Sequence, residues 1–160
     1  MKLLLPFVIA VLLLFSLGCG SGAQPLRIGD VSPAFSLESL EGEKFSSKDL
    51  LGKPVILNFW ATWCVPCRKE IPALKQIDAN NEDVRVITIA LDEGGRNPVQ
   101  RFVSRMDISY KVLLGDQEIF RRFNGFSIPY TLVLDRTLKV VRIHTGPATA
   151  EQLNRDLEGL

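Results

Sequence analysis

The stretch that decides the fold is Phe59-Trp60-Ala61-Thr62-Trp63-Cys64-Val65-Pro66-Cys67. It joins two segments of different character. The run from Val55 to Trp60 is apolar apart from Asn58, which is typical of a strand buried on both faces. The segment from about Cys64 to Ala79 follows directly and is predicted to form a helix. A pair of cysteines therefore stands where a buried strand passes into a helix.

The position of the two cysteines predicts their chemistry. Free N–H groups and the helix dipole favour negative charge at the start of a helix, and this favours a thiolate at Cys64. The thiolate is the nucleophile in disulfide exchange. Two intervening residues place Cys67 one helical turn further on, within reach of a mixed disulfide on Cys64. We therefore predict that Cys64 attacks and that Cys67 resolves. So short a spacing closes no useful structural loop, so a CxxC pair indicates redox chemistry or metal binding.

The pattern on either side of this stretch predicts alternating strands and helices. Further strands are expected at 84–91, 110–114, 131–134 and 139–143, and further helices from Asn97-Pro98 onward, at 116–123 and at 149–157. A short hairpin over 34–46 and a helical turn over 47–51 come before them. The order β-α-β-α-β-α-β-β-α predicts an α/β fold in which helices flank a central mixed sheet, with an N-terminal β-hairpin extension.

The first residues predict export. Met1-Lys2 is positive, and the apolar run from Leu3 to Leu17 is shorter than the about 20 residues of a membrane span but suits a signal-peptide core. Gly18-Cys19 then resembles a bacterial lipoprotein signal, in which Cys19 would become the lipidated first residue. Cleavage near Ala23 and an uncleaved anchor are the alternatives. The predicted organisation is a signal peptide over 1–19, a tether over 20–29 and an α/β domain over 30–160.

The charge balance argues against nucleic-acid binding. The chain has 18 acidic and 19 basic residues, and one of the basic residues, Lys2, lies in the leader. The chain beyond the leader, residues 20–160, therefore has equal numbers of both signs, and it contains no polybasic run that would indicate a nucleic-acid partner.

The stretch 59–67 resembles the active-site strand and turn of the thioredoxin superfamily. Pro72, five residues after the cysteine pair, matches that family's helix proline. Ser127-Ile128-Pro129-Tyr130-Thr131 resembles its cis-proline loop, and Gly146 matches a glycine after the last strand. Together with the hairpin and the leader, these motifs resemble the exported TlpA-like and ResA-like branch over residues 30–158.

The resemblance implies a thiol–disulfide oxidoreductase whose redox-active disulfide serves without a further cofactor or metal. It implies a cis bond between Ile128 and Pro129 that forms a docking edge beside Cys64, with Trp63 as a further contact for the partner. The implied partners are exported thiol or disulfide proteins, such as apocytochromes before haem attachment, and a membrane-embedded electron donor. A lipid anchor at Cys19 would place the domain in the periplasm or on the outer face of the cell membrane. The direction of electron flow does not follow from the motif.

One position departs from the cytoplasmic thioredoxins, which have a buried aspartate where this chain has Asn58. An amide cannot take the proton of the resolving cysteine. Glu70 lies three residues after Cys67, on the same face of the predicted helix, and the ResA-like pattern also has an acid there. We hypothesise that Glu70 is a general base or pKa tuner for the pair. The alternative is a solvated helix glutamate.

Two other functions compete with the redox interpretation. Exported copper-assembly modules of the same fold use cysteines spaced CxxxC and a distant histidine. Here the spacing is CxxC, and the only histidine, His144, is interpreted as a surface residue. A thiol peroxidase normally has threonine where this chain has Ala61. Two smaller predictions are that 93–96 forms a loop beside the active-site end of the sheet and that Arg121-Arg122 is a solvated helix face.

Overall fold

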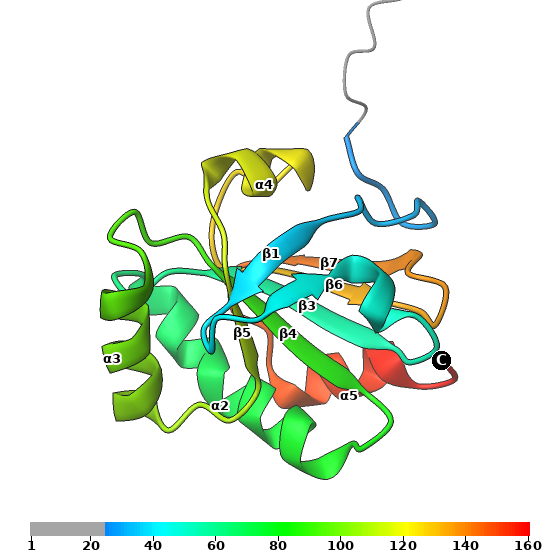
Figure 1. Ribbon diagram of the computed structural model, residues 1–160. Coiled ribbons are helices and arrows are strands. Elements are labelled where there is room, and N and C mark those ends of the chain that lie inside the picture. Colours follow the sequence, from blue (N-terminus) through cyan, green and yellow to red (C-terminus); the bar gives the residue numbers. More distant parts are fainter. Residues whose placement is uncertain (1–24) are drawn as a thin grey trace, which may run out of the picture.

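Strands and helices follow one another along residues 25–160, the part of the chain that the computed structural model describes (Figure 1). The predicted signal peptide 1–19, including Cys19, lies outside the described residues. The elements are β1 (Ser36–Ser39), β2 (Lys44–Ser46), the 3-10 helix η1 (Ser47–Leu50), β3 (Val55–Trp60), α2 (Val65–Asn80), β4 (Arg85–Ala90), α3 (Arg96–Met106), β5 (Lys111–Leu114), α4 (Gln117–Arg122), β6 (Tyr130–Leu134), β7 (Val140–Thr145) and α5 (Ala150–Leu157). From β3 onward, this is the predicted order.

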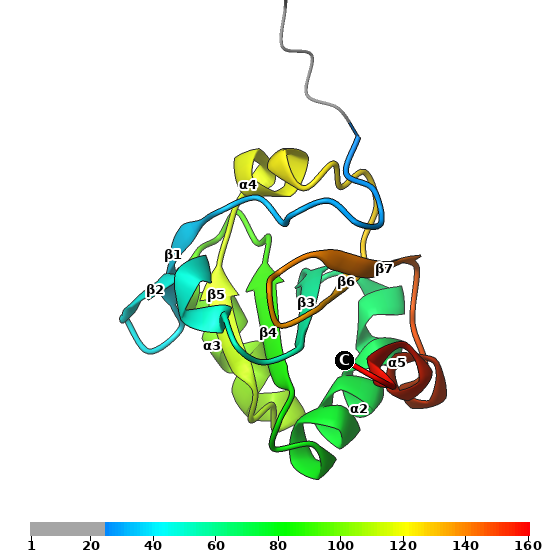
Figure 2. The same cartoon turned by 90° about the vertical axis from the view of Figure 1, so that its right-hand side faces the viewer.

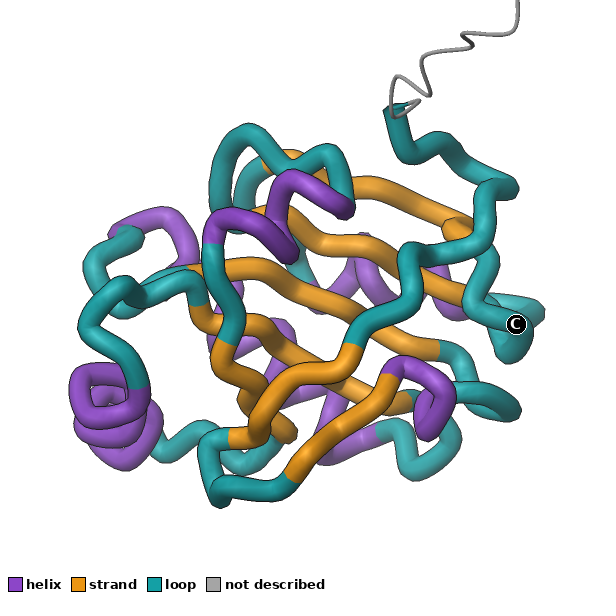
Figure 3. Tube along the Cα trace, turned by 45° about the horizontal axis from the view of Figure 1, so that its top comes forward, coloured by secondary structure: helices purple, strands orange, loops and turns teal. Residues whose placement is uncertain are grey.

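The strands of the described residues form one mixed sheet in the order β2-β1-β5-β4-β3-β6-β7. Strands β3, β4 and β5 are parallel, and all other neighbours are antiparallel. Figure 3 shows them side by side as one continuous sheet. The predicted hairpin is β1–β2, and β1 joins it to the main sheet by pairing with β5. The predicted fold class is therefore confirmed.

Two apolar layers explain why β3 is apolar at almost every position. Ile56 and Trp60 face the cluster beneath α2, α3 and α5, whereas Leu57 and Phe59 face the cluster beneath η1 and α4. Figure 2 shows α2 and α5 on one side of the sheet and α4 on the other. A strand covered on both faces needs apolar side chains in both directions. Asn58 is the exception, and it belongs to the site described below.

The N-terminal segment joins the domain before residue 30. The N–H of Gly29 donates to the carbonyl of Val140 (2.8 Å), and Leu26 packs against the cluster beneath α4. The last residues of the predicted tether 20–29 thus contact β7. Within residues 25–160, the structure contains no helix whose length and hydrophobicity would suit a membrane span.

Candidate active site

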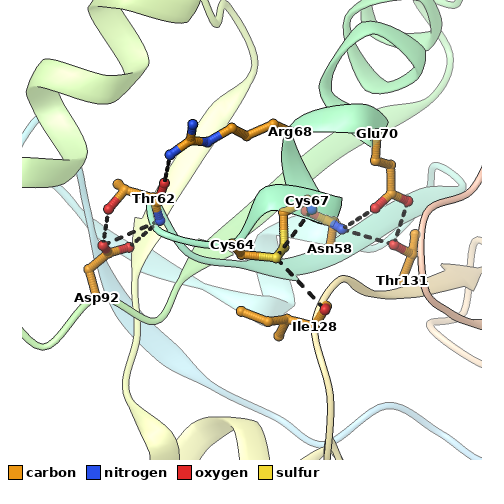
Figure 4. The surroundings of a disulfide bond; sticks show 9 residues. All are labelled: Asn58, Thr62, Cys64, Cys67, Arg68, Glu70, Asp92, Ile128 and Thr131. Atoms are coloured by element: carbon orange, nitrogen blue, oxygen red, sulfur yellow. Dashed lines mark hydrogen bonds between the residues drawn. A yellow bond between two sulfur atoms is a disulfide. The ribbon is translucent and has the colours of Figure 1, made fainter.

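Cys64 and Cys67 form a disulfide at the junction of β3 and α2 (Figure 4). Cys64 is the N-cap of α2, and its Sγ accepts a hydrogen bond from the backbone N–H of Cys67 (N–Sγ 3.2 Å). Pro66 stands at the start of the helix, where its missing N–H leaves no bond unmade. The predicted placement of the pair at a helix start is confirmed.

Exposure does not separate the two cysteines, because each is 3% exposed. The two cysteines differ in their position relative to the start of α2. Sγ of Cys64 occupies the place where an N-cap side chain receives a free N–H, and a thiolate there accepts that bond more strongly than a thiol does. The geometry therefore supports the predicted attacking role of Cys64.

The second wall of the site is the loop before β6. The Ile128–Pro129 peptide bond is cis, as predicted, and the carbonyl oxygen of Ile128 lies 3.8 Å from Sγ of Cys64. A disulfide sulfur carries no proton, so this contact becomes a hydrogen bond only when Cys64 is a thiol. On the far side of the loop, the N–H of Gly146 donates to the carbonyl of Pro129 (2.9 Å). Gly146 has φ +96°, a conformation that favours glycine.

The same loop carries an exposed aromatic residue, Phe126, that is not among the predicted site residues. A side chain on Gly125 would bring its Cβ within 1.9 Å of the Phe120 ring, so only glycine allows this close approach. Phe126 follows and is 78% exposed, and Trp63, the predicted partner contact, is 64% exposed. A phenylalanine two residues before the Ile128–Pro129 motif was the available signal.

Two hollows adjoin Trp63 at the active-site end of the sheet. One, of about 310 Å³, is lined by Trp63, Leu91, Gln117, Phe120, Phe126, Ser127 and Ile128. The other, of about 490 Å³, is lined by Trp63, Leu91, Asp92, Glu93, Gly94, Pro98 and Gln117. The second hollow places Glu93 and Gly94 of the predicted loop beside the active-site end, whereas Arg96, which was predicted to belong to that loop, is the first residue of α3. Trp63, next to Cys64 in the chain, and Ile128, whose carbonyl lies beside Sγ of Cys64, thus border the same hollow.

Glu70 is buried in a closed hydrogen-bond network (Figure 4). Its side chain is 1% exposed, so the interpretation as a solvated helix residue is wrong. Nδ2 of Asn58 donates to Oε2 of Glu70 (3.2 Å), and the hydroxyl of Thr131 donates to Oε1 (2.8 Å). Nδ2 of Asn58 also donates to the Thr131 hydroxyl (2.9 Å). Asn58 and Thr131 face each other across the β3–β6 pair, which sets this geometry.

The environment of Glu70 changes its acidity. Burial raises the pKa of Glu70 to about 7, against hydrogen bonds from Thr131, the backbone of Ala148 and Asn58 that lower it. A carboxyl group with a pKa near neutrality can take up and release a proton at physiological pH. The departure at Asn58 and the acid at Glu70 are therefore two parts of one network.

The structure changes the interpretation of His144 and of the Arg121-Arg122 pair. His144 is half-buried rather than at the surface, and its Nε2 lies 2.6 Å from Oδ2 of Asp156 in α5. Arg122 donates to the carbonyl of Ala34, so only part of the predicted solvated face is free of contacts. Residues 25–160 contain no cluster of three His, Cys, Asp or Glu side chains placed to hold a metal.

The chain that carries this disulfide, helix and cis-proline is similar to known proteins. The AhpC/TSA family matches residues 28–143. The chain belongs to this family. It is 35% identical to the thioredoxin-like protein YneN of Bacillus subtilis over 83% of the chain and 80% of that protein. It is 34% identical to the thiol-disulfide oxidoreductase ResA of Bacillus cereus over 88% of the chain and 83% of that protein.

A solved structure of a disulfide oxidoreductase is also similar to this chain. A secreted Mycobacterium tuberculosis disulfide oxidoreductase, homologous to E. coli DsbE, superposes with a TM-score of 0.70 and 27% identity. The match covers 79% of this chain and 96% of that one. The predicted resemblance to the ResA-like branch is confirmed, and the protein is a thiol–disulfide oxidoreductase of the ResA and DsbE kind.

Proposed function

We propose that this protein reduces disulfides in exported partner proteins through the Cys64–Cys67 dithiol. The observation that carries the proposal is the disulfide at the start of α2, with Sγ of Cys64 on a helix N–H and beside the Ile128 carbonyl. A nucleophilic sulfur needs both a stabilised thiolate and an adjoining surface for its partner.

The reaction proceeds in two exchanges. The Cys64 thiolate attacks one sulfur of the partner's disulfide, which breaks that S–S bond and releases one partner thiolate. The Cys67 thiolate then attacks Sγ of Cys64, forms the Cys64–Cys67 disulfide and releases the second partner thiolate. Two electrons pass to the partner, which also takes up two protons. The protein's own disulfide is the only redox group in this scheme.

Glu70 acts in the second exchange as the proton acceptor for Cys67. The two residues lie on successive turns of α2, and Figure 4 shows Asn58 beside both. The Cys67 thiol must lose its proton before it attacks, and a buried carboxylate whose pKa is about 7 can receive it. Asn58 and Thr131 keep the Glu70 carboxylate oriented by donating to its two oxygens.

The partner binds along the edge formed by Trp63, Ile128 and Pro129. Trp63 is exposed and adjoins the hollow that reaches Ile128. Apolar side chains next to the partner's cysteine would fill this hollow, and Phe126 extends its rim.

The protein works outside the cytoplasm in this proposal. The leader over 1–19, with Cys19 as a lipidation site, would anchor the domain to the membrane in the periplasm or on the outer cell face. The secreted relative supports export. The partners are exported thiol proteins, of which apocytochromes before haem attachment are one class. A membrane-embedded dithiol carrier would return the protein to its reduced form.

A trapping experiment with the full chain tests the exchange. Cys67→Ser should accumulate mixed disulfides with exported proteins, because the second exchange is blocked, whereas Cys64→Ser should accumulate none. Equal trapping by both variants would contradict the assigned roles. Equilibration of the wild-type protein with glutathione tests the direction. A potential near the about −270 mV of thioredoxin supports reduction, and one near the about −120 mV of DsbA would reverse it.

A further inference from the structure

Thr62, two residues before Cys64, is held on two sides by groups of opposite charge. Its N–H donates to both carboxylate oxygens of Asp92 (3.0 and 3.3 Å), and its hydroxyl donates to Oδ1 of the same group. From the other side, Nη2 of Arg68 in α2 donates to the Thr62 carbonyl (2.9 Å). Figure 4 shows Thr62 between Asp92 and Arg68, next to the disulfide.

These bonds fix the turn that carries Cys64. The N–H of Cys64 donates to the carbonyl of Ala61 (3.1 Å), which makes Thr62 the first central residue of a tight turn. The backbone groups of such a residue have no partner within the turn. The parallel ladder between β3 and β4 ends where the N–H of Leu91 donates to the Trp60 carbonyl (2.9 Å). The Asp92 side chain makes the next bond beyond that end, in place of a backbone group.

Neither contact with Thr62 belongs to the regular hydrogen bonding of a helix or strand. Asp92 is half-buried and follows β4, thirty residues after its partner. The Arg68 guanidinium lies over the Phe102 ring, 5.6 Å from its centre, which orients it toward the turn. A negative charge near a thiol disfavours its thiolate, and a positive charge favours it. The two groups therefore act on Cys64 with opposite sign.

We propose that Asp92 and Arg68 are positioning residues that hold the Cys64 turn from both sides and shift the redox equilibrium of the disulfide in opposite directions. The inference rests on the proposed exchange at Cys64 and Cys67. Neither residue contacts the reacting sulfur through a hydrogen bond in the structure. They act through Thr62 and through their charges.

The first test compares two neutral variants by equilibration with glutathione. Asp92→Asn should make the disulfide more oxidising, because the thiolate form of the dithiol is favoured. Arg68→Met, which keeps the aliphatic stem over Phe102, should make it more reducing. We expect a shift of about two- to fivefold in the equilibrium constant for each.

Matched controls remove the same charges close by. Glu93→Gln neutralises the exposed neighbour of Asp92, which lines the same hollow. Arg105→Met removes the guanidinium that lies over the same Phe102 ring from α3, 5.7 Å from its centre. Glu93→Gln should shift the equilibrium less than Asp92→Asn does, and Arg105→Met less than Arg68→Met does. Shifts of Asp92→Asn and Arg68→Met in the same direction, or controls with equal effects, would overturn the proposal.

The second test addresses the turn without changing charge. Thr62→Val removes the hydroxyl bond to Asp92 and should slow alkylation of Cys64 in the reduced protein about threefold. Thr62→Ser keeps the hydroxyl and should restore the wild-type rate. A slow serine variant would contradict the role of the bond. If wild-type protein performs no thiol–disulfide exchange, the proposed function fails, whereas active wild type with unshifted variants defeats only this inference.

Discussion

The network around Glu70 and the rim around Trp63 flank the same disulfide, yet they differ in their relation to water. Glu70 is 1% exposed and accepts hydrogen bonds from Asn58, Thr131 and the backbone of Ala148, whereas Trp63 and Phe126 are 64% and 78% exposed. A buried carboxyl group couples the folded state to pH because ionisation is penalised there. An exposed aromatic ring contributes little to folding and is available to a partner. Substitutions around Glu70 should therefore change the stability and its pH dependence, whereas substitutions around Trp63 should change the reaction with a partner.

The largest expected effect is on the pH dependence of stability. The pKa of Glu70 is raised from its usual 4.5 to about 7, so its contribution to stability is fully present below pH 4.5 and is lost as the pH rises through 7. The oxidised protein should lose roughly 3 kcal/mol of unfolding free energy between pH 4 and pH 8 from this group. Glu70→Gln should lack that loss.

Denaturant unfolding of the oxidised proteins measures this difference, because disulfide-bonded cysteines do not titrate and leave the comparison clean. The difference between Glu70→Gln and wild type should move in favour of the variant as the pH rises. If the unfolding free energies of wild type and Glu70→Gln changed with pH in parallel, Glu70 would not ionise in the range that its burial predicts. The contrast between the two regions would then be weaker.

A second prediction tests whether the network manages protons during exchange. Glu70→Gln should change the pH dependence of the rate at which Cys67 resolves a mixed disulfide, because the acceptor is lost. Asn58→Asp in the same background should restore part of that dependence, since it returns a carboxyl group to the buried position. Stopped-flow measurement of the resolving step reports both. A profile that Glu70→Gln leaves unchanged would assign Glu70 a structural role only.

A smaller effect is expected at Thr131. Thr131→Val keeps the shape but removes the hydroxyl that donates to Glu70 (2.8 Å), so the pKa of Glu70 should rise further. The unfolding free energy should fall by about 1–3 kcal/mol, and more at pH 8 than at pH 5, because the ionised form loses more. Thr131→Ser serves as the control that retains the bond. An equal loss in both variants would indicate packing rather than the hydroxyl.

The smallest effect on folding, and the most selective effect on partners, is expected at the rim. Phe126→Ala should slow reduction of a protein disulfide about tenfold while leaving reduction of a small disulfide and the thermal midpoint unchanged. Phe120→Ala, a buried neighbour, provides the contrast because it should lower the midpoint. If Phe126→Ala slowed both substrates equally, the rim would not be a docking surface.

The features that the sequence predicts correctly are those whose signal is local. The strand from Val55, the cysteines at the helix start and the hairpin depend on periodicity and on neighbours a few residues away. His144 was misplaced because its partner, Asp156, lies on α5, twelve residues further along. The sequence allows two interpretations of Glu70 for the same reason. Helix spacing predicts that it lies on the Cys67 face, but its burial depends on Asn58 in β3, Thr131 in β6 and the backbone of Ala148, which surround its carboxyl group.

The sequence by itself determined the order of the elements, the place of Cys64 at the start of a helix and the oxidoreductase family, because each is written in contiguous residues. Only the tertiary structure decided what surrounds the disulfide. Thr131 reaches Glu70 across 61 residues of chain, and Asp92 reaches Thr62 across 30. Such contacts arise when the sheet closes and excludes water, and exclusion of water is what shifts the acidity of Glu70.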